Sequence, residues 1–375
     1  MNQDFMRILA ALVTALIAAL AATPLVRAMA IRIGAIDVPK DARRMHKKPI
    51  PLIGGLAIFF GFSLSAGIFY SIFFGLDRQA ITVWFGGLFI VALGVIDDMI
   101  ALNPWVKLAG QFVGAGIAVS QHFVIDYVNI GGFEVDFGIA AYPITVLWIV
   151  IMTNAVNLID GLDGLACGVS AISSVSLLII AMLRSDTQTA LLTAALCGAC
   201  LGFLPYNANP AKIFMGDTGA MFLGYTLSVL SIIGAFKTSA LLSFLIPIII
   251  FGLPIFDTSF AFLRRIATGH SPFQADRRHL HHRLIDSGYS QRQSVLILYA
   301  ICSILGLLGI LLSENKLIIF VIVLAASVLI GLLNLRRIRH HAKLAAEAMH
   351  SLPADDTAPA GDSSSAEQKD EQKKQ

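Results

Sequence analysis

The chain has 375 residues, of which 57% are hydrophobic and only 14% are charged, and its formal net charge is +3. Ordinary soluble domains carry roughly 25% charged residues, so the composition excludes that class of protein. Apolar runs recur at about 20 residues, which is the length needed to cross a bilayer. We therefore predict an all-α, polytopic membrane protein.

Eleven membrane-spanning helices are predicted in chain order. Their approximate bounds are 5–30, 52–72, 80–97, 105–121, 139–157, 165–183, 188–204, 218–235, 239–265, 293–313 and 316–335. The four cysteines all lie inside these apolar runs without metal-ligand spacing, so we interpret them as small packing residues.

Basic residues are unevenly distributed among the connectors between the spans. They concentrate in 31–51, in 266–292 and after residue 335, whereas the other connectors hold single charges. Because strongly basic connectors stay in the cytoplasm, these three are predicted to be cytoplasmic. The odd number of spans then places the N terminus outside the cell and the C terminus in the cytoplasm.

Two segments outside the spans have a composition of their own. Residues 123–138 carry alternating Val, Ile, Tyr and Phe around Gly131-Gly132, which predicts a small external β-hairpin. The final residues are polar and poor in large apolar side chains, which is typical of disorder. We predict one integral-membrane domain over 1–345 and a disordered polar cytoplasmic tail over 346–375.

The most polar stretch follows the apolar run 144–152. Asn154, Asn157, Asp160 and Asp163 are each three residues apart, a spacing that keeps side chains on one slowly drifting helical face. This pattern predicts a site for a cation or a polar ligand at the end of a span. The simpler interpretation is a capped helix end followed by a turn.

Three further polar clusters lie at span ends. They are Asp97 with Asp98, Asp217 in the segment 207–219, and His279, His281 and His282 in the basic connector 266–292. All fall on the side that the charge asymmetry makes cytoplasmic. Carboxylate and amide oxygens favour magnesium over zinc, and magnesium beside a basic connector indicates a phosphate-bearing substrate.

An ion or metabolite transporter is the alternative class, because carboxylates inside a membrane also mark ion pathways. Asp257, which follows a Gly252–Pro254 break in the ninth span, fits that class best. The clustering of the other carboxylates at one surface argues against it.

The motifs together resemble one family. The chain combines Asp97-Asp98, the run Asn154 to Gly164, Phe214-Met-Gly-Asp217 and the run Ser271 to His282. This combination, over roughly residues 5 to 335, resembles the polyprenyl-phosphate N-acetylhexosamine-1-phosphate transferases, the MraY/WecA/TagO superfamily of bacterial membrane enzymes. The resemblance implies a multi-pass protein of the bacterial plasma membrane, with its active site on the cytoplasmic face.

The resemblance also implies a reaction. Family members move a sugar 1-phosphate from a UDP-sugar to undecaprenyl phosphate and release UMP, with Mg²⁺ as cofactor and Mn²⁺ as a substitute. Leu280 interrupts the histidine run here, as in the WecA/TagO branch, so the implied donor is UDP-N-acetylglucosamine. The product would start a teichoic acid linkage unit or an O-antigen-type glycan. Another UDP-N-acetylhexosamine, or UDP-MurNAc-pentapeptide of the peptidoglycan branch, remains the alternative donor.

Roles for single residues follow from the motif match. The resemblance implies Asp217 and Asp98 as magnesium ligands, and Asp97 as base or as the group that orients the acceptor phosphate. It places His279 among the catalytic residues. The implied substrate-binding residues are Lys47, Lys48, Asn154, Asn157, Asp160, Asp163, Phe214, Arg278, His281, His282 and Arg283. Among these, Phe214 would stack on uracil and Lys47 or Lys48 would reach the nucleotide. The histidines, with Arg278 and Arg283, would bind diphosphate and sugar.

Several of these assignments have a structural alternative. Asp97-Asp98 could be a solvated helix end, the histidine cluster could attract lipid headgroups, and Phe214 could serve packing. Lys47 and Lys48 could be topology signals alone. Direct attack by the lipid phosphate is the preferred route, and a carboxyl-phosphate intermediate is the alternative. Membrane lipids are expected partners, nucleic acid is not, and a homodimer is left open.

Overall fold

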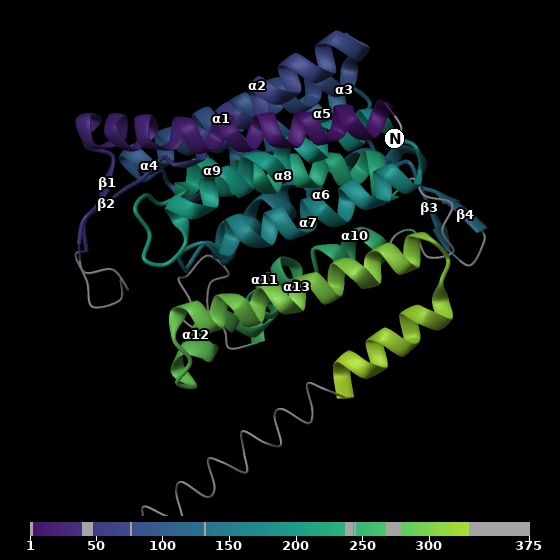
Figure 1. Ribbon diagram of the computed structural model, residues 1–375. Helices are drawn as coiled ribbons and strands as arrows, with labels where there is room; N and C mark the ends of the chain where they lie inside the picture. Colours follow the sequence, from purple (N-terminus) through teal and green to yellow (C-terminus); the bar gives the residue numbers. More distant parts are fainter. Residues whose placement is uncertain are drawn as a thin grey trace, which may run out of the picture. The chain divides into compact units, whose positions relative to one another are not determined.

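The computed structural model describes residues 3–39, 48–75, 77–130, 133–236, 243, 245–267 and 279–329. The chain divides into a main unit, Met1–Ile322, and a second unit that begins at Val323. All elements labelled in Figure 1 belong to the main unit. The predicted tail, Lys47 and Arg278 lie outside the described residues.

The described part of the main unit is almost entirely helical. Its helices are α1 (Gln3–Ile33), α2 (Gly55–Phe74), α3 (Arg78–Ile81), α4 (Gly87–Ile100), α5 (Pro104–Ser120), α6 (Ala141–Ile159), α7 (Leu165–Leu183), α8 (Thr187–Asn207), α9 (Gly216–Ser231), α10 (Leu245–Ile250), α11 (Gly252–Ala267), α12 (Leu280–Asp286) and α13 (Gln291–Ser313). Two π-helical segments, η1 (Thr82–Gly86) and η3 (Ile232–Phe236), precede α4 and follow α9, and a short 3₁₀ turn, η2 (Gly138–Ala140), precedes α6. The long helices lie side by side with roughly parallel axes (Figure 1).

Eight helices within the described ranges are long and apolar enough to cross a membrane. They are Gln3–Ile33, Gly55–Phe74, Arg78–Ile100, Gly138–Ile159, Leu165–Leu183, Thr187–Asn207, Gly216–Gly234 and Gln291–Ser313. These helices confirm a polytopic all-α membrane protein. The total of eleven spans and the orientation of the termini remain predictions.

The ninth predicted span, 239–265, differs from the structure. In its described part the chain forms α10 and then α11, with Phe251 between the two helices. Pro247 lies inside α10, and Gly252 and Pro254 open α11. Proline lacks the N–H that a continuous helix needs and clashes with the preceding turn, so these residues divide the segment.

Helix α9 lies at the centre of the main unit and packs against α2, α4, α6 and α7. Glycines let its neighbours approach closely: a methyl group on Gly55 would overlap the Gly219 backbone, and one on Gly94 would overlap the Thr218 backbone. Gly224 of α9 meets the backbone of Thr153 on α6 in the same way. Small residues at such contacts are typical of helix packing in membranes. The start of α9, which carries Asp217, is therefore held by backbone contacts with α2 and α4.

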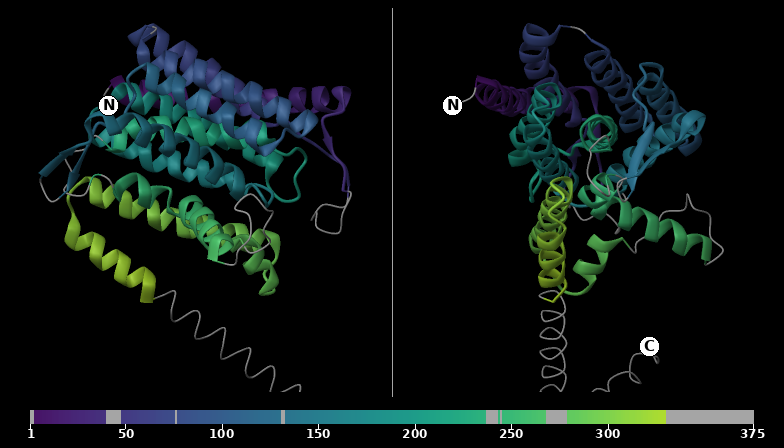
Figure 2. Two further views of the ribbon diagram at one scale, coloured as in Figure 1. Left: turned by 180° about the vertical axis from the view of Figure 1, so that it is seen from behind. Right: turned by 90° about the vertical axis from the view of Figure 1, so that its right-hand side faces the viewer.

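Two small antiparallel sheets lie at opposite ends of the long helices (Figures 1 and 2). Strands β3 (Tyr127–Ile130) and β4 (Phe133–Asp136) form the predicted hairpin, which confirms its existence. Strands β1 (Ile36–Asp37) and β2 (Ile50–Pro51) pair at the other end, beside the start of α9: the Phe214 N–H donates to the Pro51 carbonyl over 2.8 Å.

Candidate active site

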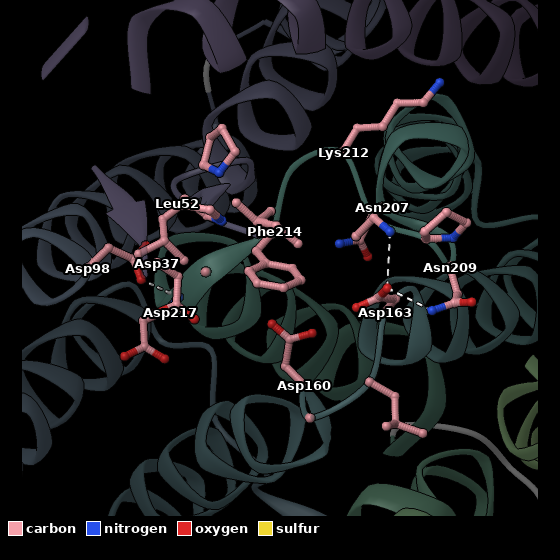
Figure 3. Close-up of a pocket in the computed structure, with 18 of the residues that line it drawn as sticks. Asp37, Leu52, Asp98, Asp160, Asp163, Asn207, Asn209, Lys212, Phe214 and Asp217 are labelled. Atoms are coloured by element: carbon pink, nitrogen blue, oxygen red, sulfur yellow. Dashed lines mark hydrogen bonds between the residues drawn. The ribbon is translucent and has the colours of Figure 1, made fainter. Parts of the chain in front are cut away.

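A cavity of about 1040 Å³ opens at the β1–β2 end of the helices (Figure 3). It has a size typical of small-molecule sites. Its polar and aromatic lining residues are Arg27, Asp37, Lys48, Asp97, Asp98, Asn157, Asp160, Asp163, Asn207, Asn209, Lys212, Phe214, Asp217, His282 and Gln291. Residues from the three predicted clusters around Asp97, Asp160 and Asp217 therefore meet around one space, together with one residue of the histidine cluster.

The backbone on both sides of Phe214 is hydrogen-bonded to the segment that follows β2. The Gly54 N–H donates to the Phe214 carbonyl over 3.0 Å, and the Gly55 N–H donates to the Met215 carbonyl over 2.8 Å. The half-buried Phe214 ring projects between the Asp217 side and the Asp163 side of the cavity (Figure 3). This position suits a ring that stacks on a flat ligand.

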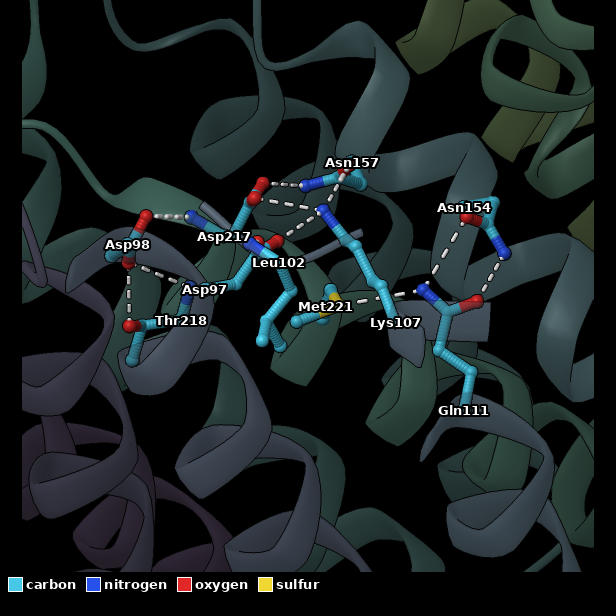
Figure 4. A network of polar contacts seen from close by, with 10 residues as sticks. All are labelled: Asp97, Asp98, Leu102, Lys107, Gln111, Asn154, Asn157, Asp217, Thr218 and Met221. Carbon is cyan, nitrogen blue, oxygen red and sulfur yellow. Dashed lines mark hydrogen bonds and ion pairs between the residues drawn. The ribbon is translucent and has the colours of Figure 1, made fainter. Parts of the chain in front are cut away.

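Lys107 forms the centre of a polar network at the Asp217 side (Figure 4). Its ammonium group lies 2.7 Å from Asp217 Oδ2 and 2.8 Å from Asp97 Oδ2, and it donates to Asn157 Oδ1 over 3.3 Å. The Asn157 amide donates to the other Asp217 oxygen. The two carboxylates thus converge on a position that already holds a positive charge.

Asp98 has a different environment from its neighbour Asp97. It accepts hydrogen bonds from the N–H groups of Asp217 (2.8 Å) and Thr218 (3.0 Å) and from the Thr218 hydroxyl (2.6 Å). These donors belong to the first turn of α9, where a negative charge is favourable. Asp98 therefore joins the end of α4 to the start of α9 and fixes the backbone that carries Asp217.

Asn154 does not line the cavity. Its amide pairs with Gln111 on α5, with hydrogen bonds of 2.5 and 3.3 Å, and donates to the Val150 carbonyl over 2.8 Å. These bonds satisfy polar groups that would otherwise be costly inside an apolar bundle. The structure therefore places Asn154 between α5 and α6, next to the site but without contact to its space.

The four residues spaced by three do not share one helical face, so that part of the sequence prediction is wrong. Helix α6 ends at Ile159, and Asp160 is its C-terminal cap residue. Gly164, with φ +79°, turns the chain into α7, a conformation that glycine adopts without steric cost. Asn157 is on the helix, whereas Asp160 and Asp163 reach the cavity from the turn.

Asp160 has a strongly raised pKa. Burial, together with the negative charges of Asp217, Asp98 and Asp163, raises the pKa of Asp160 from 3.8 to about 8. The folded protein therefore holds a proton on this carboxyl at pH values where the unfolded chain has lost it, so the contribution of Asp160 to stability falls as the pH rises from about 4 to about 8.

We expect Asp160→Asn to remove this loss. Between about pH 6 and about pH 8 the variant should lose less stability than the wild type, by on the order of 1 kcal/mol. Melting temperatures of both proteins in detergent, measured over this range without divalent metal, provide the check. Parallel pH profiles would show that Asp160 is ionised in the folded protein at neutral pH.

Asp163 lies on the opposite side of the cavity from Asp217 (Figure 3). Its Oδ2 atom accepts hydrogen bonds from the Asn209 amide (2.9 Å) and the Ala211 N–H (3.0 Å). Near it, the Arg27 guanidinium donates to the Lys212 carbonyl over 3.1 Å. The segment between α8 and α9 is thus held both by the Asp163 turn and by α1.

The three histidines have different positions. His279 Nδ1 lies 3.0 Å from Asp257 Oδ2, and the Leu280 N–H donates to the other Asp257 oxygen over 2.8 Å. His281 is buried against Gly161, and burial, with the charge of His282, lowers its pKa to about 4. A neutral imidazole is a weak phosphate ligand, so His281 does not suit that role. Of the three histidines, His282 lines the cavity. Arg283 is exposed on α12.

Several residues of the site were missed by the sequence prediction. Lys107 and Arg27 are charged residues inside predicted spans, a signal that by itself indicates function in a membrane protein. Asn209, Lys212 and Gln291 gave no such signal, because polar residues outside spans are ordinary. Asp257, which had fitted a transporter best, instead pairs with His279 and the start of α12.

Apolar helices that end around an acidic cavity with basic walls define a multi-pass membrane protein with a site for a charged, phosphate-bearing ligand. The model of the family "Glycosyl transferase family 4" matches residues 80–235, which include Asp97, Lys107, Asp160 and Asp217. A probable undecaprenyl-phosphate N-acetylglucosaminyl 1-phosphate transferase of Bacillus subtilis (strain 168) is 41% identical over 345 residues, which cover 89% of this chain and 95% of that protein. The chain belongs to glycosyl transferase family 4, as its resemblance to the MraY/WecA/TagO enzymes predicted.

Two other relatives show the breadth of the family. A decaprenyl-phosphate N-acetylglucosaminephosphotransferase of Mycolicibacterium smegmatis is 37% identical, over 76% of this chain and 77% of that protein. A phospho-N-acetylmuramoyl-pentapeptide-transferase of Anoxybacillus flavithermus is 34% identical, over 73% of this chain and 87% of that protein. The protein is therefore a glycosyl-1-phosphate transferase of the membrane.

Proposed function

We propose that this protein transfers N-acetylglucosamine 1-phosphate from UDP-N-acetylglucosamine to undecaprenyl phosphate and releases UMP. The main support is the acidic cavity that is lined together by the separate motifs around Asp97, Asp160 and Asp217. The names of the Bacillus and Mycolicibacterium relatives, which specify N-acetylglucosamine and a polyprenyl phosphate, agree with this assignment. The product would start a lipid-linked glycan of the bacterial cell envelope.

In this reaction an oxygen of the lipid phosphate attacks the β-phosphorus of the donor. The bond between that phosphorus and the bridging oxygen breaks, and the oxygen leaves on UMP. The reacting groups are both anionic, so charge neutralisation and alignment are the main tasks of the site. Lys107 carries the positive charge nearest to Asp97 and Asp217 among the described residues, and Asp97 beside it would orient the acceptor phosphate.

Magnesium fits the oxygen-rich side of the cavity. Two carboxylates and an amide oxygen already surround the Lys107 ammonium group, and hard oxygen donors of this kind suit Mg²⁺ and Mn²⁺. No group of three His, Cys, Asp or Glu side chains stands ready to hold a metal in the part of the chain that the structure describes, so phosphate oxygens or water would complete the shell. Asp217 is our first choice of ligand, with Asp97 or Asp98 nearby. When bound, the metal would neutralise phosphate charge and align the reactants.

The donor end would lie on the Phe214 and Asp163 side. Phe214 offers a ring to the uracil, and Asp160, Asn157 and Lys48 also line the cavity. His282 would approach the diphosphate or sugar, with Arg278 and Arg283 as further candidates from the same connector. The muramoyl-pentapeptide donor remains the runner-up, because one relative is named for it.

Purified protein incubated with undecaprenyl phosphate, magnesium and a radiolabelled UDP-sugar tests the proposal. We expect label from UDP-N-acetylglucosamine to become extractable into organic solvent, and label from UDP-MurNAc-pentapeptide to stay in water. Efficient transfer from the pentapeptide donor would place the chain in the peptidoglycan branch. If the protein were instead an ion or metabolite transporter, all of the label would stay in water.

The proposed active site faces the cytoplasm, with the N terminus outside. The uneven distribution of basic residues supports this orientation. Asp37, Ile50 and Pro51 of β1 and β2 line the cavity, and these two strands lie at the opposite end of the helices from the β3–β4 hairpin (Figure 1). A cysteine introduced by Ile285→Cys should therefore react with a membrane-impermeant thiol reagent only from the cytoplasmic side, and one introduced by Ile130→Cys only from outside. External labelling at 285 would reverse the assignment.

A further inference from the structure

The orientation of the Asp163 carboxylate depends on two hydrogen bonds, and the one from a side chain is donated by Asn209. Both hydrogen bonds to the Asp163 carboxylate, from the Asn209 amide and from the Ala211 N–H, end on Oδ2. Neither bond uses Oδ1, and Asp163 lines the cavity. A carboxylate held by one oxygen presents the other in a fixed direction, which is the geometry needed to accept a hydrogen bond from a ligand.

Asn209 is in turn held by the start of α13. Its amide nitrogen donates to Gln291 Oε1 over 2.7 Å, and its main-chain carbonyl accepts from Arg292 Nε over 3.0 Å. A side-chain amide has two N–H donors, so Asp163 and Gln291 use both. Aspartate has the same shape but no side-chain N–H to give either partner, so it cannot satisfy this pair of acceptors.

Helix α13 also holds the other end of the same turn. The Tyr299 hydroxyl donates to the Gly164 carbonyl over 2.5 Å. Ser290 and Gln293 form a reciprocal cap at the first turn of α13, with bonds of 2.9 and 3.3 Å, which fixes the backbone on which Gln291 lies. The Asp163 turn is therefore held between Asn209 and Tyr299, and both contacts are set by α13, which lies beyond the segment that the family model matches.

We infer that Asn209 is a positioning residue for the sugar-nucleotide donor: it transmits the position of α13 to Asp163 and fixes the carboxylate oxygen that faces the cavity. The inference rests on the proposed function, because it assigns Asp163 to the donor. Asn209 itself acts through Asp163 and need not touch the substrate. The acceptor lipid phosphate, expected near Asp97 and Lys107 on the other side of Phe214, should not depend on it.

Asn209→Asp tests the inference. The variant keeps the size of the side chain but places carboxylate oxygens against Asp163 and Gln291, so the Asp163 carboxylate should turn away. We expect the Kd for UDP-N-acetylglucosamine, measured by calorimetry on the full chain in detergent, to rise about tenfold or more, equivalent to about 1.4 kcal/mol. The KM for the donor should rise in parallel, while kcat at saturating donor and the KM for undecaprenyl phosphate stay within about twofold.

Two variants at Gln291 separate positioning from charge. Gln291→Glu adds the same negative charge to the same side of the cavity but keeps an acceptor for Asn209, so it should weaken donor binding clearly less than Asn209→Asp. Gln291→Leu adds no charge and removes the acceptor, so it should weaken donor binding several-fold. If Asn209→Asp and Gln291→Glu weakened binding equally, charge alone would explain the effect and the inference would be wrong.

Other outcomes also decide the matter. Donor binding by Asn209→Asp equal to that of the wild type, in a protein with an unchanged melting temperature, would overturn the inference. Equal loss for donor and acceptor together with a lowered melting temperature would show a general structural role and would overturn it as well. A wild-type protein that binds no UDP-N-acetylglucosamine would instead refute the proposed function, which keeps the two failures distinct.

Discussion

Replacing Asp217 by asparagine should lower kcat by about 10²–10³-fold or more, the range found when one preorganised charged or polar group is removed from an active site. Asp217 stands at the first turn of α9 and faces both the cavity and the Lys107 ammonium group. Asparagine keeps the shape of the side chain but removes the negative charge, and with it a ligand for Mg²⁺. The protein should stay folded, because Asp97 still pairs with Lys107.

The measurement is kcat at saturating concentrations of both substrates, with the melting temperature and elution volume as tests of folding. Asp136→Asn is a matched control, because Asp136 is an exposed carboxylate on the β3–β4 hairpin. That variant should turn over at the wild-type rate. Near-normal turnover by Asp217→Asn would move the metal ligand to another aspartate.

Lys107→Met should lower the free energy of unfolding by about 3 kcal/mol in the absence of divalent metal. This value is the lower end of the cost of breaking a buried ion pair. The Lys107 side chain is 16% exposed and that of Asp97 is 7% exposed, so their charges are poorly solvated. Without the ammonium group, Asp97 and Asp217 would repel one another in a confined space. The lower estimate applies because the Asp217 side chain is 33% exposed.

Magnesium should restore much of that stability. In the wild type a cation that binds between these carboxylates must compete with Lys107, whereas in Lys107→Met it meets two unpaired carboxylates. The melting temperature of the variant should therefore rise more steeply with magnesium concentration than that of the wild type. Lys316→Met, at an exposed lysine after α13, should change neither the stability nor its magnesium dependence. Identical magnesium titrations for Lys107→Met and the wild type would place the metal away from this pair.

The parts of the site that the sequence predicted are those with a local signal. Asp97, Asp160 and Asp217 follow or begin apolar runs, and hydropathy located those runs. Their shared cavity followed from the prediction that all three span ends lie on one side. The helical face proposed for Asp160 and Asp163 was wrong because α6 ends at Ile159 and Gly164 adopts a positive φ in the turn that follows, which period-three spacing does not reveal.

The parts that were missed depend on packing between distant segments. Lys107 contacts Asp217 across 110 positions in the chain, and Asn209 contacts Gln291 across 82. No pattern within either segment indicates the partner. Arg27 and Lys107 could have been found as lone charges in predicted spans, whereas Asn209 required the positions of α8 and α13 in three dimensions.

The glycine contacts around α9 bear on how this enzyme can change shape during turnover. Backbone lies against backbone where α9 meets α2 at Gly55, α4 at Gly94 and α6 at Gly224, so no side-chain rotation can loosen these contacts and close packing resists sliding. We therefore expect the helices that carry Asp97, Asn157 and Asp217 to form a rigid frame whose relative positions do not change during turnover. An inhibitor shaped to that frame would meet the same carboxylate geometry at every stage of the cycle.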